Sequence, residues 1–143
     1  MKNTVSRKEE REILAGLLFE TEFRRDESVE DVFALSTENR DIPVTQYIKD
    51  VYFGVYENVE RIDEVISQSS NGWKPERISK LSLSILRLCV YEMMFRDDIP
   101  NTVSINEAIE LAKRFDDDRA RPFINGILKS VMRKLEGENG TQK

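Results

Sequence analysis

Apolar positions near the start of the chain fall three and four residues apart. This stripe spans residues 13–23 and follows a capping-box pattern at residues 6–9, which predicts a helix that begins there. A shorter stripe at residues 29–35 and a longer one at residues 44–66 predict a second helix and a long third helix. Gly54, inside the long stripe, is expected to allow a close crossing with another helix.

The second half of the chain contains its most apolar stretch. Residues 81–95 leave almost no polar face, as expected of a central helix that is buried on all sides. Ser104 and Glu107 have the spacing of a second capping box, and the helix after it is expected to bury Phe115. Apolar residues at helical spacing over 119–135 predict the last helix. Together these stripes predict an all-α fold.

The length of the chain, 143 residues, fits one domain with a core of its own. The polar segment SQSSNG at residues 67–72 is the best candidate for a boundary between an N-terminal subdomain, about 6–70, and a C-terminal subdomain, about 71–136. Trp73 is expected to anchor the core between the two halves. Residues 137–143 form a polar tail that we expect to be disordered.

The composition excludes several kinds of chemistry. The chain has no histidine, which excludes histidine-based acid–base catalysis and metal ligation, and its one cysteine, Cys89, lies in an apolar run. A lone thiol fits the reducing cytoplasm, and no apolar stretch reaches the ~18 residues of a membrane span. Asp116, Asp117 and Asp118 lack the spacing of metal ligands and are better explained as a helix cap. We expect no cofactor and no bound metal.

Charge is distributed unevenly along the chain, whose formal net charge is -5. Residues 1–25 hold six basic and five acidic side chains, residues 26–112 hold eight and seventeen, and residues 113–134 hold seven and three. The two ends are therefore basic and the middle is acidic. Arg87 and Glu92 are charged exceptions in the apolar central helix. We expect both to be structural, with Arg87 reaching the carbonyl groups of a neighbouring helix end.

The predicted first helix contains a cluster of cations. Arg7 and Arg11 are four residues apart and Lys8 lies beside them, so all three are expected to project from one face. Such a cluster can attract an anionic partner. Glu9 and Glu10 lie between the cations, so from spacing alone the simpler interpretation is a solvated helix face with paired charges.

The most specific motifs of the chain are ILRLCVYEMMFRDDIPNTVSINEAIELAKRF at residues 85–115 and PFINGIL at residues 122–128. In order and spacing they resemble the hallmark patterns of the NusB family of bacterial transcription antitermination factors. At the front, SRKEEREILAGLLFE at residues 6–20 is similar to the arginine-rich opening helix of that family. The resemblance covers nearly the whole chain.

The resemblance implies an all-α fold of about seven helices, three in an N-terminal and four in a C-terminal subdomain. It also implies a transcription antitermination factor that binds the boxA element of ribosomal RNA leader transcripts and catalyses no reaction. The implied partners are NusE, a small-subunit ribosomal protein, and the RNA polymerase elongation complex with the other Nus factors. Some members of the family self-associate, and the sequence leaves a monomer and a homodimer open.

For RNA binding, the resemblance points to Arg7, Lys8 and Arg11 on the first helix and to Lys113 and Phe123 in the C-terminal motifs. A cation and an aromatic ring can supply a phosphate contact and base stacking. For Phe123, packing in the core is the simpler interpretation.

For partner binding, the resemblance points to the first helix and to the start of the central one. The candidates there are Phe19, Glu76, Arg77 and Ser82. The acidic middle of the chain suits a basic ribosomal protein.

Two alternatives stay open. Family members often have basic or small residues where this chain has Glu9 and Glu10, and acids among phosphate-facing cations weaken RNA affinity. The chain is therefore also compatible with a helical adaptor that binds protein and no RNA. The other alternative is an accessory RNA-binding subunit of an rRNA-modifying enzyme.

Overall fold

The computed structural model describes residues 5–71 and 74–139. These residues form seven α-helices, one short 3-10 turn and no strand. The helices are α1 (Arg7–Glu22), α2 (Val29–Asn39), α3 (Gln46–Glu57), α4 (Val59–Ser69), α5 (Lys80–Phe95), α6 (Asn101–Phe115) and α7 (Ala120–Asn139), and the 3-10 turn η1 (Pro75–Arg77) precedes α5. The predicted all-α fold is confirmed.

Helix α1 begins where the sequence predicts. The Ser6 hydroxyl accepts a hydrogen bond from the backbone N–H of Glu9 at 3.0 Å, and the Glu9 carboxylate accepts one from the N–H of Ser6 at 2.8 Å. This closed capping box satisfies two of the backbone donors that a helix start leaves unpaired. The Glu9 side chain therefore stabilises the N-terminal end of α1.

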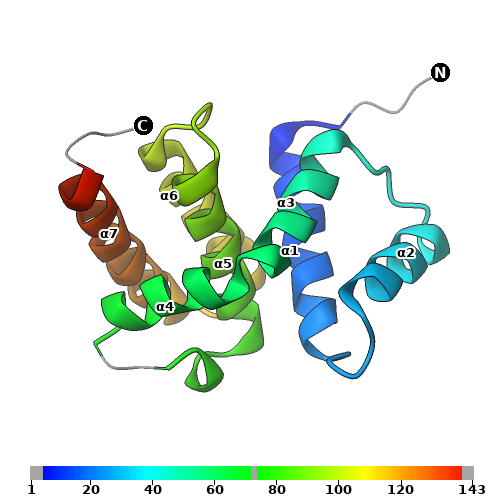
Figure 1. The fold of residues 1–143 in the computed structure, drawn as a ribbon, viewed down its shortest axis with the longest axis horizontal. Coiled ribbons are helices and arrows are strands. Elements are labelled where there is room, and N and C mark those ends of the chain that lie inside the picture. Colours follow the sequence, from blue (N-terminus) through cyan, green and yellow to red (C-terminus); the bar gives the residue numbers. More distant parts are fainter. Residues whose placement is uncertain (1–4, 72–73, 140–143) are drawn as a thin grey trace.

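Helix α5 is the central element of the fold (Figure 1). Residues 82–93 are all buried, and α5 packs against α1, α3, α4, α6 and α7. A helix that is covered on every side presents no face to water, which explains why this stretch is almost wholly apolar. Helices α2 and α7 lie at opposite ends of the long axis of the molecule (Figure 1).

The single long helix predicted over residues 44–66 is wrong, because two helices occupy this stretch. Helix α3 ends at Glu57 and α4 begins at Val59, with Asn58 between them at φ -119° and ψ 19°. The Asn58 side-chain amide donates to the Gly54 carbonyl at 2.8 Å. A side chain that takes over a backbone acceptor favours the end of a helix. Apolar residues keep their helical spacing across this bend, so the sequence pattern gives no sign of it.

Gly54 allows the close crossing that we expected. A Cβ atom at this position would lie 2.5 Å from Cε1 of the Tyr91 ring on α5. Because real Cβ atoms do not approach other atoms so closely, glycine is the residue that lets α3 and α5 pack at this distance.

Helix α6 begins three residues before the predicted capping box. Its N-cap is Pro100 and its first residue is Asn101. Proline is compatible with a helix start because its ring fixes φ, but it has no N–H to donate to a preceding helical turn, so the helix does not extend further back. Ser104 therefore lies inside the helix, buried, where its hydroxyl donates to Glu92 at 2.7 Å. At the other end, Phe115 is 46% exposed, so its predicted burial is wrong. It is the last residue of α6, where the chain turns away from the core.

A buried ion cluster connects α1, α4 and α5. Arg87 donates to the Asp63 carboxylate at 2.7 and 2.9 Å and to Glu22 at 2.8 Å. Its partners are thus carboxylates and not the carbonyl groups that we expected. Burial alone would lower the pKa of Arg87, but its hydrogen bonds to Asp63 and the charges of Asp63 and Glu22 raise that pKa above the ordinary value. The guanidinium therefore stays charged and paired.

The subdomain boundaries stay predictions. Helix α4 continues to Ser69, inside the expected break at residues 67–72, and it packs mainly with α5 and α7. We therefore place the division at the α3–α4 junction as a proposal. Helix α7 continues to Asn139, three residues into the expected tail. Trp73 and residues 140–143 lie outside the described residues. Among the helices that the structure describes, none could span a membrane.

Candidate nucleic-acid interface

The three cations predicted on one face of α1 have different surroundings. Arg7 donates through Nε to Glu10 at 2.9 Å, and its guanidinium lies 3.9 Å from the centroid of the Tyr47 ring. Lys8 is exposed and has no ion pair or hydrogen bond within the described residues. Arg11 is only 5% exposed. The prediction that all three project together is therefore wrong for Arg11.

Arg11 belongs to a buried network that joins α1, α3, α5 and α6. Its guanidinium donates to both oxygens of Glu92, at 2.9 and 3.1 Å. The hydroxyls of Tyr47 and Ser104 donate to the same carboxylate. Burial alone would lower the pKa of Arg11, but its hydrogen bonds to Glu92 and the charge of that carboxylate raise the pKa above its ordinary value. Arg11 therefore stabilises the fold, and its burial leaves little of the guanidinium accessible to a phosphate.

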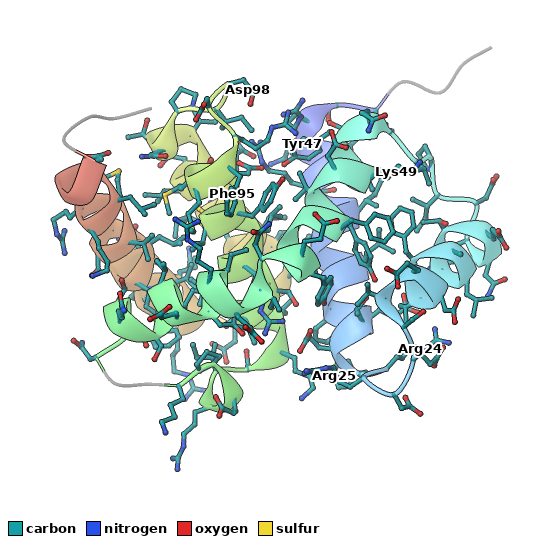
Figure 2. All side chains as sticks on the ribbon, in the orientation of Figure 1. Arg24, Arg25, Tyr47, Lys49, Phe95 and Asp98 are labelled. Carbon is teal, nitrogen blue, oxygen red and sulfur yellow. The ribbon has the colours of Figure 1, made fainter. Side chains whose placement is uncertain are left out.

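Tyr47 connects this network to the surface. Burial and the nearby Glu92 carboxylate raise the pKa of Tyr47, so its hydroxyl stays protonated and donates. The guanidinium groups of Arg7 and Arg96 lie 3.9 and 5.3 Å from its ring centroid. Figure 2 shows Tyr47 and Asp98 at the same edge of the molecule, and Arg96 holds Asp98 through hydrogen bonds of 3.1 Å. Arg96 is thus neutralised at this edge.

Glu9 and Glu10, which interrupt the cations in the sequence, both have structural roles. Glu9 closes the capping box of α1. Glu10 is 7% exposed and accepts hydrogen bonds from Arg7 and from the Thr45 hydroxyl that caps α3. Glu10 therefore neutralises much of the charge of Arg7. Among the described residues, Lys8 is thus the cation of α1 that is exposed and has no ion pair.

The end of α6 adjoins this part of α1. Arg114 pairs with Glu12 of α1 at 3.2 Å, and Glu12 lies one helical turn after Lys8. Lys113, beside Arg114, is exposed. The structure therefore brings Lys8 and Lys113, two of the predicted residues, onto adjoining surfaces.

Two residues at the end of α6 were missed by the sequence reasoning. Phe115 is exposed, and the Arg114 guanidinium lies 5.3 Å from its ring centroid. An exposed ring beside cations can stack on a base while the cations contact phosphates. The run Lys113, Arg114 and Phe115 at a predicted helix end was the available signal.

Phe123 is half-buried and packs against the hydrophobic core, as its simpler interpretation required. Its neighbours in α7 line a groove of about 720 Å³ between α6 and α7. The groove is lined by Asn106, Ile109, Glu110, Asp118, Arg121, Pro122 and Asn125. It offers amide, carboxylate and guanidinium groups beside the exposed end of α6.

Phe19, the predicted partner residue on α1, packs against a second aromatic ring. The rings of Phe19 and Phe23 meet edge to face, with centroids 4.9 Å apart. Phe23, which the sequence reasoning did not select, is 61% exposed. The Lys80 ammonium group lies 5.4 Å from its ring centroid, so the end of α1 adjoins the start of α5.

The other predicted partner residues differ in exposure. Glu76 and Arg77 are exposed on η1, and Glu76 lines a pocket of about 300 Å³ together with Lys80. Ser82 is buried, and its hydroxyl donates to Asp116 at 2.7 Å. Its predicted partner contact is corrected, because the side chain links α5 to the turn before α7.

The aspartates before α7 act on the backbone. Asp116 accepts from the N–H of Asp117 and Asp117 accepts from the N–H of Arg119, both at 2.9 Å. These bonds organise the turn, as a cap does. Within residues 5–71 and 74–139, no group of acidic or cysteine side chains is arranged to hold a metal ion.

The fold and these surfaces define a class of small helical proteins, built around one buried helix, with cations and aromatic rings exposed at the helix ends. The chain belongs to the NusB family, whose model matches residues 8–133. The match runs from the start of α1 through most of α7. The resemblance seen in the motifs is thus confirmed.

The relatives are similar along almost their whole length. The transcription antitermination protein NusB of Acetivibrio thermocellus is 43% identical over 96% of this chain and 97% of its own. That of Natranaerobius thermophilus is 44% identical over 92% of this chain and 97% of its own.

Solved structures share the fold. T. maritima NusB is 33% identical with a TM-score of 0.79, over 95% of this chain and 99% of that one. A chain in a crystal structure of antitermination factors NusB and NusE in complex with dsRNA is 23% identical with a TM-score of 0.79, over 90% of this chain and 96% of that one.

Proposed function

We propose that this chain is a transcription antitermination protein that binds boxA-type RNA of rRNA leader transcripts together with NusE. The complex acts on RNA polymerase with the other Nus factors. The observation that carries the proposal is the 43% identity to a transcription antitermination protein over 96% of this chain. A complex of NusB with NusE and dsRNA, which contains a chain of this fold, supports the same choice of partners. The proposed role is binding without catalysis or cofactor, in the cytoplasm where transcription occurs.

The RNA contact is proposed at the start of α1 and the end of α6. Proteins hold single-stranded RNA by combining phosphate contacts from cations with stacking on exposed rings. Lys8, Lys113 and Phe115 supply both kinds of group on adjoining surfaces. Arg7 adds a charge that Glu10 partly neutralises. Arg11 contributes indirectly by fixing α1 on α5.

The NusE contact is proposed at the end of α1, at η1 and at the start of α5. Phe19 and Phe23 provide an aromatic anchor there, with Glu76 and Arg77 exposed nearby. Aromatic side chains are typical of the central part of protein interfaces. Residues 26–112 hold eight basic and seventeen acidic side chains, and this acidic balance complements a basic ribosomal protein.

A second candidate function is a helical adaptor that binds protein and no RNA. It is favoured by the pairing of Arg7 with Glu10, Arg11 with Glu92 and Arg114 with Glu12. Each of these carboxylates reduces the attraction of its cation for a phosphate. In this case the C-terminal end of α1, together with η1, would form the protein-binding surface, and the N-terminal start of α1 would be a solvated face.

Binding of labelled boxA RNA to the purified chain, alone and with NusE, tests the two candidates. The proposal predicts tighter binding of boxA than of a scrambled RNA with the same composition, and a further increase when NusE is added. A chain that binds NusE but does not discriminate boxA from the scrambled RNA, even in the complex, is an adaptor.

A further inference from the structure

The outward face of α7 is a basic surface that neither proposed contact uses. Residues three and four apart on this face are exposed along almost the whole helix. They are Arg119, just before the helix, and Pro122, Gly126, Lys129 and Arg133 within it. We call this set the α7 stripe. All of its charged members are basic.

The charges of the α7 stripe are available to a ligand. Lys129 and Arg133 have no ion pair or hydrogen bond within the described residues, and they follow each other by one turn, a rise of about 6 Å. Arg119 pairs with Asp117 at 3.5 Å, but it is 94% exposed, so water and salt screen that pair. On a chain with a net charge of -5, a basic stripe with two unpaired cations is a local site for a polyanion.

Gly126 is not explained by packing within the chain. It is exposed in the interior of α7, and a Cβ atom built on it meets nothing within 4 Å. Gly54, in contrast, lies against Tyr91. Glycine is the least favourable residue of a helix interior apart from proline. At an exposed position it leaves the helix backbone open to close approach by another molecule.

We propose that the α7 stripe binds the sugar–phosphate backbone of RNA that continues beyond the boxA-type segment. Gly126 lets the strand lie against the helix, and Lys129 and Arg133 contact successive phosphates. The stripe begins at Arg119, across a short turn from Lys113 at the end of α6, so a strand that leaves the proposed RNA contact can continue along α7. Phosphate contacts carry no sequence information. The extension is therefore bound whatever its sequence, and this inference rests on the proposed function.

The experiment compares boxA RNA with the same RNA extended on both sides by arbitrary sequence, each bound to the complex of the chain with NusE. The natural chain is expected to bind the extended RNA more tightly. The double variant Lys129→Gln with Arg133→Gln is expected to bind boxA alone as before and to lose the increase from the extension. The salt dependence of log K for the extended RNA should become shallower by about 1.4, since each single-strand phosphate contact contributes about 0.7.

The matched control is Arg40→Gln with Lys49→Gln, which removes the same charge from Arg40, the C-cap of α2 that pairs with Glu20, and from the exposed Lys49 of α3. Helix α2 lies at the opposite end of the molecule from α7 (Figure 1), and Lys49 lies on the same side as α2 (Figure 2). It is expected to keep the increase from the extension. Gly126→Ala supplies an independent test. It should raise the melting temperature of the protein, because there is space for the methyl group. It should also weaken binding of the extended RNA, while binding of boxA RNA stays unchanged.

Three results are decisive against the inference. Equal affinity of the natural chain for boxA and extended RNA removes the need for a second contact and leaves the proposed function intact. If the double variant retains the increase in affinity from the RNA extension, the contact lies elsewhere on the chain. A double variant that changes self-association or NusE affinity and not RNA affinity makes the stripe a protein contact. Failure of the natural complex to bind boxA at all overturns the proposed function itself.

Discussion

The Glu92 carboxylate lies inside the protein and accepts hydrogen bonds from Arg11, Tyr47 and Ser104. Removing a carboxylate from water costs several kcal/mol unless other donors replace the water. Here the donors come from α1, α3 and α6, while Glu92 itself lies on α5. At the residue scale, the first cation cluster of the sequence is thus divided: Arg11 is buried and fixes the fold, whereas Lys8 is exposed and is the residue that we propose for RNA binding.

Replacing Arg11 tests this division. Arg11→Met leaves Glu92 buried without its cation and should lower the free energy of unfolding by about 3–5 kcal/mol, as measured by urea denaturation. Adding Glu92→Gln should recover part of the loss, because the remaining buried group is neutral. Arg114→Met, which breaks a pair whose arginine is 61% exposed, should change stability by less than about 1 kcal/mol. Equal losses in the two arginine variants would place Arg11 at the surface.

The tyrosines predict how stability depends on alkaline pH. Burial is the main cause that raises the pKa of Tyr47, Tyr52, Tyr56 and Tyr91, and it raises the pKa of Tyr52 to about 12. An unfolded tyrosine loses its proton near pH 10. Above that pH the unfolded chain releases protons that the folded chain retains, so the stabilisation present below pH 10 is lost as pH rises through the raised pKa values.

We therefore expect tyrosinate absorbance and the loss of helical circular dichroism to appear together above pH 10 in an alkaline titration. Tyr52→Phe removes one of these groups, together with its hydrogen bonds to Thr21 and Val29, and should make the loss of stability above pH 10 less steep. Tyrosinate that forms near pH 10 while the helices remain intact would contradict the raised pKa values.

At the scale of elements, the strongly patterned helices could be predicted from the sequence. The capping box of α1 and the apolar run of α5 follow from local rules, and both elements form as expected. The break at Asn58 could not be predicted, because apolar spacing continues across it and the decisive bond is one side chain to Gly54. The start of α6 was misplaced because the spacing of Ser104 and Glu107 also occurs inside helices, where Ser104 serves Glu92.

Two glycines inside helices provide a matched test of packing. Gly16→Ala on α1 meets nothing within 4 Å and should stabilise the protein by about 0.5–1 kcal/mol through helix propensity. Gly54→Ala places a methyl group 2.5 Å from the Tyr91 ring and should destabilise it by about 1–3 kcal/mol. Adding Tyr91→Leu should reduce that loss. Thermal unfolding of the variants checks the signs, and a stabilising Gly54→Ala would mean that α3 and α5 cross less closely.

At the scale of the whole molecule, the motifs identified the family, while the candidate site needed the fold. Helical projection places Arg7 and Arg11 on one face, but α1 turns Arg11 toward Glu92 of α5. In the same way, Arg114 of α6 pairs with Glu12 of α1. Contacts between residues so far apart in the chain depend on how α1, α5 and α6 pack. The proposed joint role of Lys8 and Lys113 in RNA binding likewise depends on that packing.

The measurement that tests the central claim most directly is the affinity of the complex with NusE for boxA RNA across a range of salt concentrations. The natural chain is compared with Lys8→Gln plus Lys113→Gln and with the control Arg40→Gln plus Lys49→Gln. The account predicts that boxA is preferred over scrambled RNA, that the first variant weakens binding and reduces the salt slope by about 1.4, and that the control does neither. The same affinity and slope in all three proteins, or no preference for boxA in the natural one, would contradict it.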